Sequence, residues 1–175
     1  MQLVRNYKTY FTTLANSHVT LHGNVAVGSE DLSAVFDGDL RTNLPDSGGW
    51  LFLIINPVIR PVSYGNQLDA KWMAGFIILK NVPLRDSVNA DIDTAFDEAM
   101  SVTADFILKM VSDSRAGISF WNSAFDALDE GKCDVETMPL LKVQDGSFVG
   151  YKVIFHVQLP FTNCSDFDSL SVKFT

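Results

Sequence analysis

The residues best suited to metal chemistry are two histidines near the N-terminus. His18 and His22 are four positions apart, so on a helix both imidazoles could face one zinc ion. A zinc protease pattern also requires a glutamate directly after the first histidine, and that position is Val19. Because no third ligand is evident, we interpret the two histidines as a polar pair at a helix end, and we predict no metal and no other cofactor.

Two pairs of closely spaced carboxylates are candidates for binding a divalent cation. Asp37 and Asp39 lie in the stretch DGDLR, and Asp91 and Asp93 lie in DID. A calcium loop that starts at Asp37 needs a glutamate at its twelfth position, where the sequence has Gly48. We therefore interpret the first pair as part of a turn and the second as the negatively charged start of a helix.

Patterns of covalent or nucleotide-dependent catalysis are missing from the sequence. Cys133 and Cys164 lie in neither a CxxC pattern nor a protease context, and we expect two reduced thiols. The sequence has no GxSxG elbow, Walker loop or GxGxxG fingerprint. A glycosidase-like carboxylate pair stays open, because nothing singles out one pair among 21 acidic residues. We predict that the protein is not an enzyme.

Composition limits the class of protein further. With 175 residues, 47% of them apolar, the chain is long enough for one domain with a sizeable core, and we predict a single domain over residues 1–175. A net charge of −8 disfavours a protein that grips nucleic-acid phosphates over its whole surface. We expect no secretory signal, no membrane partner and a cytoplasm-like compartment, since every apolar run is shorter than the roughly 20 residues that span a bilayer.

The first half of the chain predicts a helix, a loop and a hairpin. Apolar residues at helical spacing favour an amphipathic helix over residues 3–22. Residues 23–49 are rich in glycine and aspartate and indicate a long loop, with one short strand near residues 34–36. The hairpin that follows pairs a strand that begins after Gly49 and stops by Pro57 or Pro61 with a second strand over residues 71–81.

The second half predicts a long helix and a closing hairpin. An apolar stripe at intervals of three or four residues marks a helix over residues 89–114. Asp145-Gly146 is the turn signal of a hairpin that starts at Met138, and its final strand, Tyr151–Phe161, alternates apolar and polar residues apart from Ile154. Residues 162–175 form an irregular tail. This order predicts an α+β fold, an antiparallel or mixed β-sheet with an N-terminal helix and one long central helix packed on one face.

Three stretches carry a resemblance to a known class of proteins: YFTTLANSHVTLHG, AFDEAMSVTADFILKMVSD and FVGYKVIFHVQLPF. In sequence and in order of elements the chain resembles phage tail terminator, or tail completion, proteins and the related neck and cap proteins of contractile injection machines. The Gly/Asp-rich segment 23–49 departs from that pattern, which leaves a terminator and another connector ring as alternatives.

The resemblance implies a structural protein of the virion, at the tail or the head–tail neck, assembled in the bacterial cytoplasm. It implies a ring of copies of this chain, commonly a hexamer, that ends tail-tube polymerisation, contacts tube and neck proteins, and passes DNA through its lumen without sequence-specific binding. The hairpin 51–79 and the loop 23–49 are the expected contact regions. The candidate interface residues are Phe36, Asp37, Asp39, Arg41, Trp50, Trp72, Phe76 and Phe161.

Two alternatives stay open at this point. Each tryptophan beside a strand boundary either covers the core or contacts a neighbouring subunit, since tryptophan is favoured at protein contacts. A small ligand-binding domain or enzyme, with its pocket between sheet and helix, is the second class of function.

Overall fold

In the part of the chain that it describes, the computed structural model has two helices and a five-stranded sheet, which confirms the predicted α+β class. The structure describes residues 2–22, 25–29, 48–64, 67–82, 89–116, 133–143 and 148–160. The elements are, in chain order, α1 (Gln2–Ser17), β1 (Val25–Ser29), β2 (Trp50–Tyr64), β3 (Gln67–Asn81), α3 (Asn89–Arg115), β4 (Cys133–Val143) and β5 (Phe148–Pro160).

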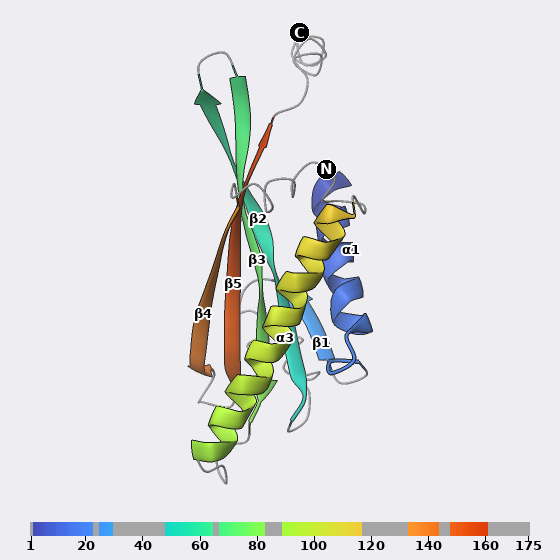
Figure 1. Cartoon of the computed structure of the whole chain (residues 1–175), viewed down its shortest axis with the longest axis vertical. Helices are drawn as coiled ribbons and strands as arrows, with labels where there is room; N and C mark the ends of the chain where they lie inside the picture. Colours follow the sequence, from blue (N-terminus) through green and yellow to red (C-terminus); the bar gives the residue numbers. More distant parts are fainter. Residues whose placement is uncertain are drawn as a thin grey trace.

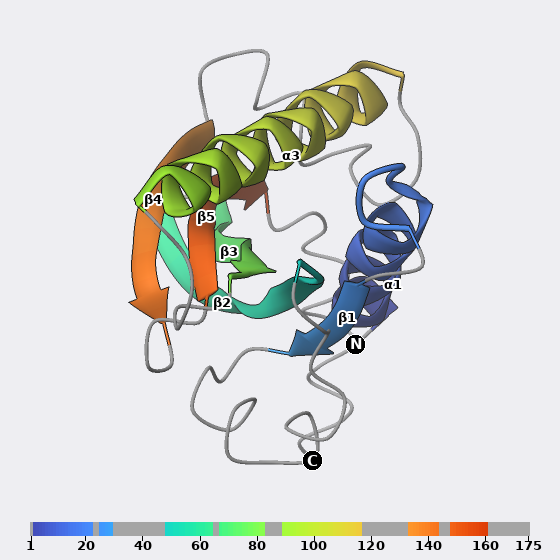
Figure 2. The same cartoon turned by 90° about the horizontal axis from the view of Figure 1, so that it is seen from below.

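The sheet is mixed, with strand order β1-β2-β3-β5-β4. The pairs β2–β3, β3–β5 and β4–β5 are antiparallel, while β1 runs parallel to β2 at one edge. Figures 1 and 2 show α1 and α3 together on one side of this sheet, as predicted for the long helix. The two helices run antiparallel, since Tyr10 contacts Asp113 and His18 contacts Asp105.

The main core lies between the sheet and the two helices. Even-numbered positions of β2 and β3 and odd-numbered positions of β5 point into it, as the alternation of a strand requires. Phe11 of α1 and Phe106 of α3 meet Phe52 and Phe76 of the sheet, with ring centroids 5.1–6.3 Å apart. The predicted inward face of the final strand is confirmed at Val153 and Phe155, which are fully buried.

The opposite face of the sheet carries a second apolar cluster. Its buried members are Leu51, Leu53, Ile77, Leu79 and Phe148. Both faces of the first half of β2 are therefore buried, and this explains why LFLII lacks polar residues at alternate positions. Both described helices lie on the other face.

Helix α1 ends earlier than predicted. It stops at Ser17, and residues 18–22 form turns in which the Leu21 and His22 N–H groups both donate to the His18 carbonyl. Leu21 is buried in the core although it lies beyond the helix, so its apolar side chain fits the helical spacing that the sequence suggested. Val19, which was also counted in that spacing, is exposed.

Strand β2 does not stop at either proline, so that prediction is wrong. The ladder with β3 shifts register between Ile55 and Val58, so Pro57 lies in a bulge where no ladder N–H is needed. Pro61 lies where β2 is an open edge among the described strands, because β1 pairs only with Trp50–Ile54. Strand β3 correspondingly begins at Gln67, four residues before the predicted start.

Two further strand boundaries differ from the prediction. A strand does form in the segment predicted as a loop, but at Val25–Ser29; residues 34–36 lie outside the described residues. The closing hairpin starts at Cys133, and its last strand ends at Pro160. The tail predicted over residues 162–175 and most of the loop 23–49 also lie outside the described part of the chain.

Candidate interaction surface

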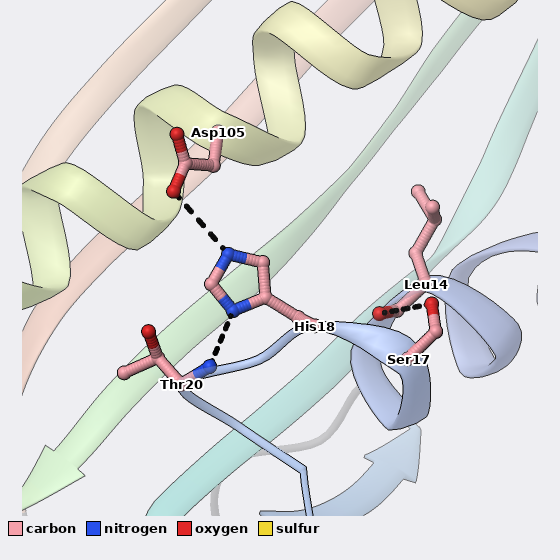
Figure 3. Close-up of polar contacts among 5 residues, drawn as sticks. All are labelled: Leu14, Ser17, His18, Thr20 and Asp105. Atoms are coloured by element: carbon pink, nitrogen blue, oxygen red, sulfur yellow. Dashed lines mark hydrogen bonds and ion pairs between the residues drawn. The ribbon is translucent and has the colours of Figure 1, made fainter.

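His18 sits where α1 faces α3, and Figure 3 shows both of its ring nitrogens in contacts. Its Nε2 lies 3.4 Å from Asp105 Oδ2, and its Nδ1 accepts a hydrogen bond of 3.3 Å from the Thr20 N–H. An Nδ1 that accepts places the ring proton on Nε2, facing the carboxylate. A general base needs a nitrogen free to take a proton from a substrate, and neither nitrogen is free in this arrangement.

His22 closes the same helix end from the other side. Its Nδ1–H donates to the Asn16 carbonyl over 2.9 Å, one of the last carbonyls of α1, which have no partner within the helix. Both imidazoles therefore form hydrogen bonds with backbone groups at or just after the end of α1. Across the described ranges, no three His, Cys, Asp or Glu side chains gather as a metal site.

The two carboxylate pairs have different outcomes. Asp91 lies in the first turn of α3 and is exposed, and Asp93 is exposed two residues later, as predicted for the negative start of a helix. Asp37, Asp39 and the rest of the stretch 37–41 lie outside the described residues.

Two predicted interface residues belong to the subunit's own core. Trp50 is 3% exposed and Phe76 is fully buried, because both occupy even-numbered positions that face the helices. They offer no surface to another subunit, so their assignment as interface residues is wrong, and the core alternative for Trp50 is confirmed. Trp72 lies in β3 opposite Ile59 and Val157 in register. The predicted interface residues outside the described part are Phe36, Asp37, Asp39, Arg41 and Phe161.

Trp50 and Lys80 form the cross-strand pair that closes one end of the core. The Lys80 Nζ lies 5.4 Å from the Trp50 ring centroid and forms an ion pair with Glu98 of α3. Burial lowers the pKa of the Lys80 ammonium, since burial disfavours its charged form. The ion pair between Lys80 and Glu98 links β3 to α3.

Tyr7 anchors the centre of the sheet to α1. Its hydroxyl accepts a hydrogen bond from the Gly75 N–H (2.9 Å) and donates to the Gly75 carbonyl (2.7 Å), with the Ile55 carbonyl 3.1 Å away as a second acceptor. Ile55 and Gly75 are the last pair before the bulge in β2. The phenol therefore satisfies backbone groups at the point where the ladder loses its register.

Beyond this point the sheet continues as what we call the hairpin arm, Val58–Tyr64 paired with Gln67–Met73. Its seven residue pairs extend roughly 23 Å at about 3.3 Å per residue. Figure 1 shows the arm and the end of β5 projecting past the ends of both helices. The buried residues of β2 and β3 stop at Ile54 and Ala74, so within the described side chains the arm adds nothing to the core.

A second exposed feature lies on the solvent side of α3. Met100 and Leu108 are 42% and 66% exposed, and the exposed Ala104 lies midway between them at helical spacing. We call Met100, Ala104 and Leu108 the α3 stripe. Asp97 and Asp105, both exposed, lie one turn before Met100 and Leu108.

The sequence prediction missed Tyr7 and the α3 stripe, whereas the hairpin 51–79, which contains the arm, was an expected contact region. A signal existed for the stripe, because Met100 and Leu108 are large apolar residues that fall outside the helical apolar series. That series is Ile92, Phe96, Ala99, Val102, Phe106 and Met110, of which the last four are buried. The continuation of β2 through the arm had no such signal, because Pro57 and Pro61 argued against it.

Comparison with known proteins gives no match to a family model and no curated protein with significant sequence similarity. Neither described helix carries an apolar stretch long enough to cross a lipid bilayer. The hairpin arm and the α3 stripe are therefore two separate candidate contact surfaces, chosen on geometric grounds alone.

Proposed function

We propose that this chain is a structural subunit that assembles into a ring with copies of itself, as a phage tail terminator or a related neck or cap protein. The observation that carries the proposal is the hairpin arm, which projects past the helices and extends the sheet well beyond the subunit's own core. Strand β5 pairs with β3 as far as Asp69, so the arm is three-stranded along most of its length, but no described helix covers it. A projecting sheet of this length is best explained by a neighbour that packs against it.

The order of elements supports the same class. The chain runs from an N-terminal helix through a hairpin and a long helix to closing strands, the order that the sequence resemblance implied. The proposed action is geometric: one face of the ring matches the last ring of the tail tube, and the other lacks the surface to which a further tube ring would bind.

The alternative, a small enzyme or ligand-binding domain, gains no support from the described polar residues. His18, the histidine with a carboxylate partner, uses both ring nitrogens in contacts within the subunit. No other described residues suggest a reaction centre.

The net charge of −8 suits a ring that DNA passes through, because an acidic wall repels DNA rather than holding it. We expect acidic side chains such as Asp37, Asp39 or Asp46 to line the lumen. An assembled ring with a neutral or basic bore would contradict this part of the proposal.

Light scattering after size exclusion, combined with negative-stain imaging, tests the ring. We expect discrete closed particles of uniform diameter, alone or when purified tail tubes are added, and we expect them at tube ends. A compact monomer or dimer that does not bind tail tubes at any concentration would refute the proposed function.

A further inference from the structure

Two exposed surfaces of this chain lie on opposite sides of its sheet. The first, which we call the outer arm face, contains the arm positions that continue the sheet face away from the helices: Val58, Arg60 and Val62 of β2, and Asp69, Lys71 and Met73 of β3. Of these, Val58 is 43% exposed and Arg60 is exposed. The second surface is the α3 stripe, on the solvent side of the helix layer.

The outer arm face contains an unfavourable charge arrangement. Arg60 and Lys71 are directly opposite each other in the β2–β3 register. Like charges at directly opposite positions of an antiparallel pair destabilise it. The Arg60 side chain is exposed, so it offers a positive charge where the arm projects from the body.

The α3 stripe offers the opposite charge beside apolar side chains. Asp97 precedes Met100 by one turn, and Asp105 precedes Leu108 by one turn, so carboxylates border the stripe. The Asp105 side chain is 58% exposed even though one of its oxygens faces His18. The helix surface could therefore neutralise a basic group placed beside the stripe.

The spacings of the two surfaces also agree. Val58 and Val62 are four strand residues apart, about 13 Å, with Arg60 midway between them. Met100 and Leu108 are eight helical residues apart, about 12 Å, with Ala104 midway between them. Setting the valines on Met100 and Leu108 brings Arg60 level with Ala104, beside Asp105.

Within one copy these surfaces cannot meet, because the sheet lies between them. We infer that the outer arm face of one copy docks on the α3 stripe of a second copy of this chain, with Val58 against the apolar stripe and Arg60 beside Asp105. The inference rests on the proposed self-assembly and names its contact. Each such contact leaves one arm and one stripe unused, so it is heterologous and can propagate around an axis until a ring closes.

Cysteine pairing tests the contact directly. In a background with Cys133→Ser and Cys164→Ser, one preparation carries Val58→Cys and a second, tagged preparation carries Leu108→Cys. After mixing and mild oxidation, we expect a disulfide-linked dimer of one tagged and one untagged chain, and a ladder of linked species from a chain that carries both cysteines. Tryptic mass spectrometry identifies which cysteines are joined.

Charge and shape variants add a quantitative measurement. We expect Leu108→Glu, and separately Arg60→Glu, to weaken association about ten-fold or more, as the loss of a central contact does. Ser112→Glu, exposed one turn further along α3, and Lys8→Glu on α1 are the matched controls and should leave association within about two-fold. Circular dichroism checks that each variant is folded.

The outcomes separate the inference from the proposed function. Closed rings that yield no Val58–Leu108 disulfide, or mainly Val58–Val58 links, overturn the docking inference and leave the ring standing. Open filaments or reciprocal dimers joined by the Val58–Leu108 disulfide support the docking and overturn the ring. Monomers at every concentration, with no disulfide formed between copies, overturn both.

Discussion

At the scale of single residues, the Tyr7 hydroxyl joins the first helix to the middle of the sheet. It satisfies both backbone groups of Gly75 where the bulge in β2 interrupts the ladder. A close backbone approach explains the glycine, because a Cβ at position 75 would lie 2.0 Å from the Val153 carbonyl oxygen. A tyrosine and a glycine thus fix the point from which the arm extends.

Tyr7→Phe tests this role. The variant keeps the ring contacts with Phe11 and Phe155 but leaves buried backbone groups without a partner, which should lower the free energy of unfolding by about 1–3 kcal/mol. Urea denaturation measures the change. Tyr151→Phe is the matched control, since no hydrogen bond of the Tyr151 hydroxyl is found among the described residues, and it should change stability by less than about 0.5 kcal/mol at neutral pH.

Tyr151 should make stability fall at alkaline pH. Burial, and then the nearby Asp97 carboxylate, raise its phenol pKa above the ordinary value of 10.0. The unfolded chain therefore loses this proton first, so the contribution to stability is intact below pH 10 and is lost as pH rises through the folded-state pKa.

Denaturation between pH 9 and pH 11 measures that loss. We expect Tyr151→Phe to remove this component of the decline and Asp97→Asn to reduce it. Lys80 acts in the opposite direction below pH 10.5, because its pKa is lowered in the folded state, and the comparison between variants cancels its effect. Identical curves for all three proteins would contradict the assignment.

At the scale of elements, the hairpin arm is a part of the sheet that the subunit's own core does not require. Among the side chains that the structure describes, the buried residues of β2 and β3 all lie between the bulge and the far end of the sheet. Two prolines in β2 are compatible with the arm only because one lies in a bulge and the other on an open edge.

Replacing residues 59–72 by Asn-Gly removes the arm, together with the β3 partners of Val157–Pro160 in β5, and keeps the core of the body. Val58 and Met73 are directly paired, so a two-residue turn can join them. We expect the shortened chain to fold with a free energy of unfolding lower by no more than about 2 kcal/mol, but to lose self-association. A chain that no longer folds would show that the arm belongs to the folding unit.

The sequence predicted the elements that have a strong period and missed those that depend on distant partners. The stripe along α3 and the alternation in β5 are local signals, and both elements were predicted correctly. Strand β1 has five residues, and its parallel pairing with β2 leaves no local trace. Strand β2 continues through Pro57 and Pro61 because the first lies in a bulge and the second has no β1 residue beside it. Both conditions depend on how the strands pair, which the local sequence does not show.

The same reasoning explains the outcome for the candidate surface. Trp50 and Phe76 were predicted as interface residues by their type and by the hairpin that carries them, but the helix-facing register buries both. In the sequence, Leu108 differs from the core residues of α3 only because it lies outside their helical spacing. Its exposure follows from the positions of α1 and the sheet, which cover other faces of α3.

At the scale of the whole molecule, one core joins both helices to three strands. Side chains from α1, α3, β2, β3 and β5 share a single cluster of buried residues. Such a core gives no natural division of the chain into separately folding parts.

We therefore expect one cooperative unfolding transition. Tryptophan fluorescence, which reports on the buried Trp50, and far-ultraviolet circular dichroism, which reports mainly on the helices, should give coincident denaturation curves. Two separated transitions would indicate a second domain and would contradict the predicted single domain.

The prolines in the exposed strands also bear on non-native association between copies of this chain. Pro139 lies in β4, which is an edge among the described strands, and Pro57 and Pro61 lie in the part of β2 beyond its pairing with β1. Each proline removes a backbone donor from these stretches. A polypeptide that adds to the sheet at β4 or beside the arm part of β2 therefore finds backbone donors missing. We expect concentrated solutions of this protein to form no amyloid fibrils, and any aggregates to dissolve on dilution.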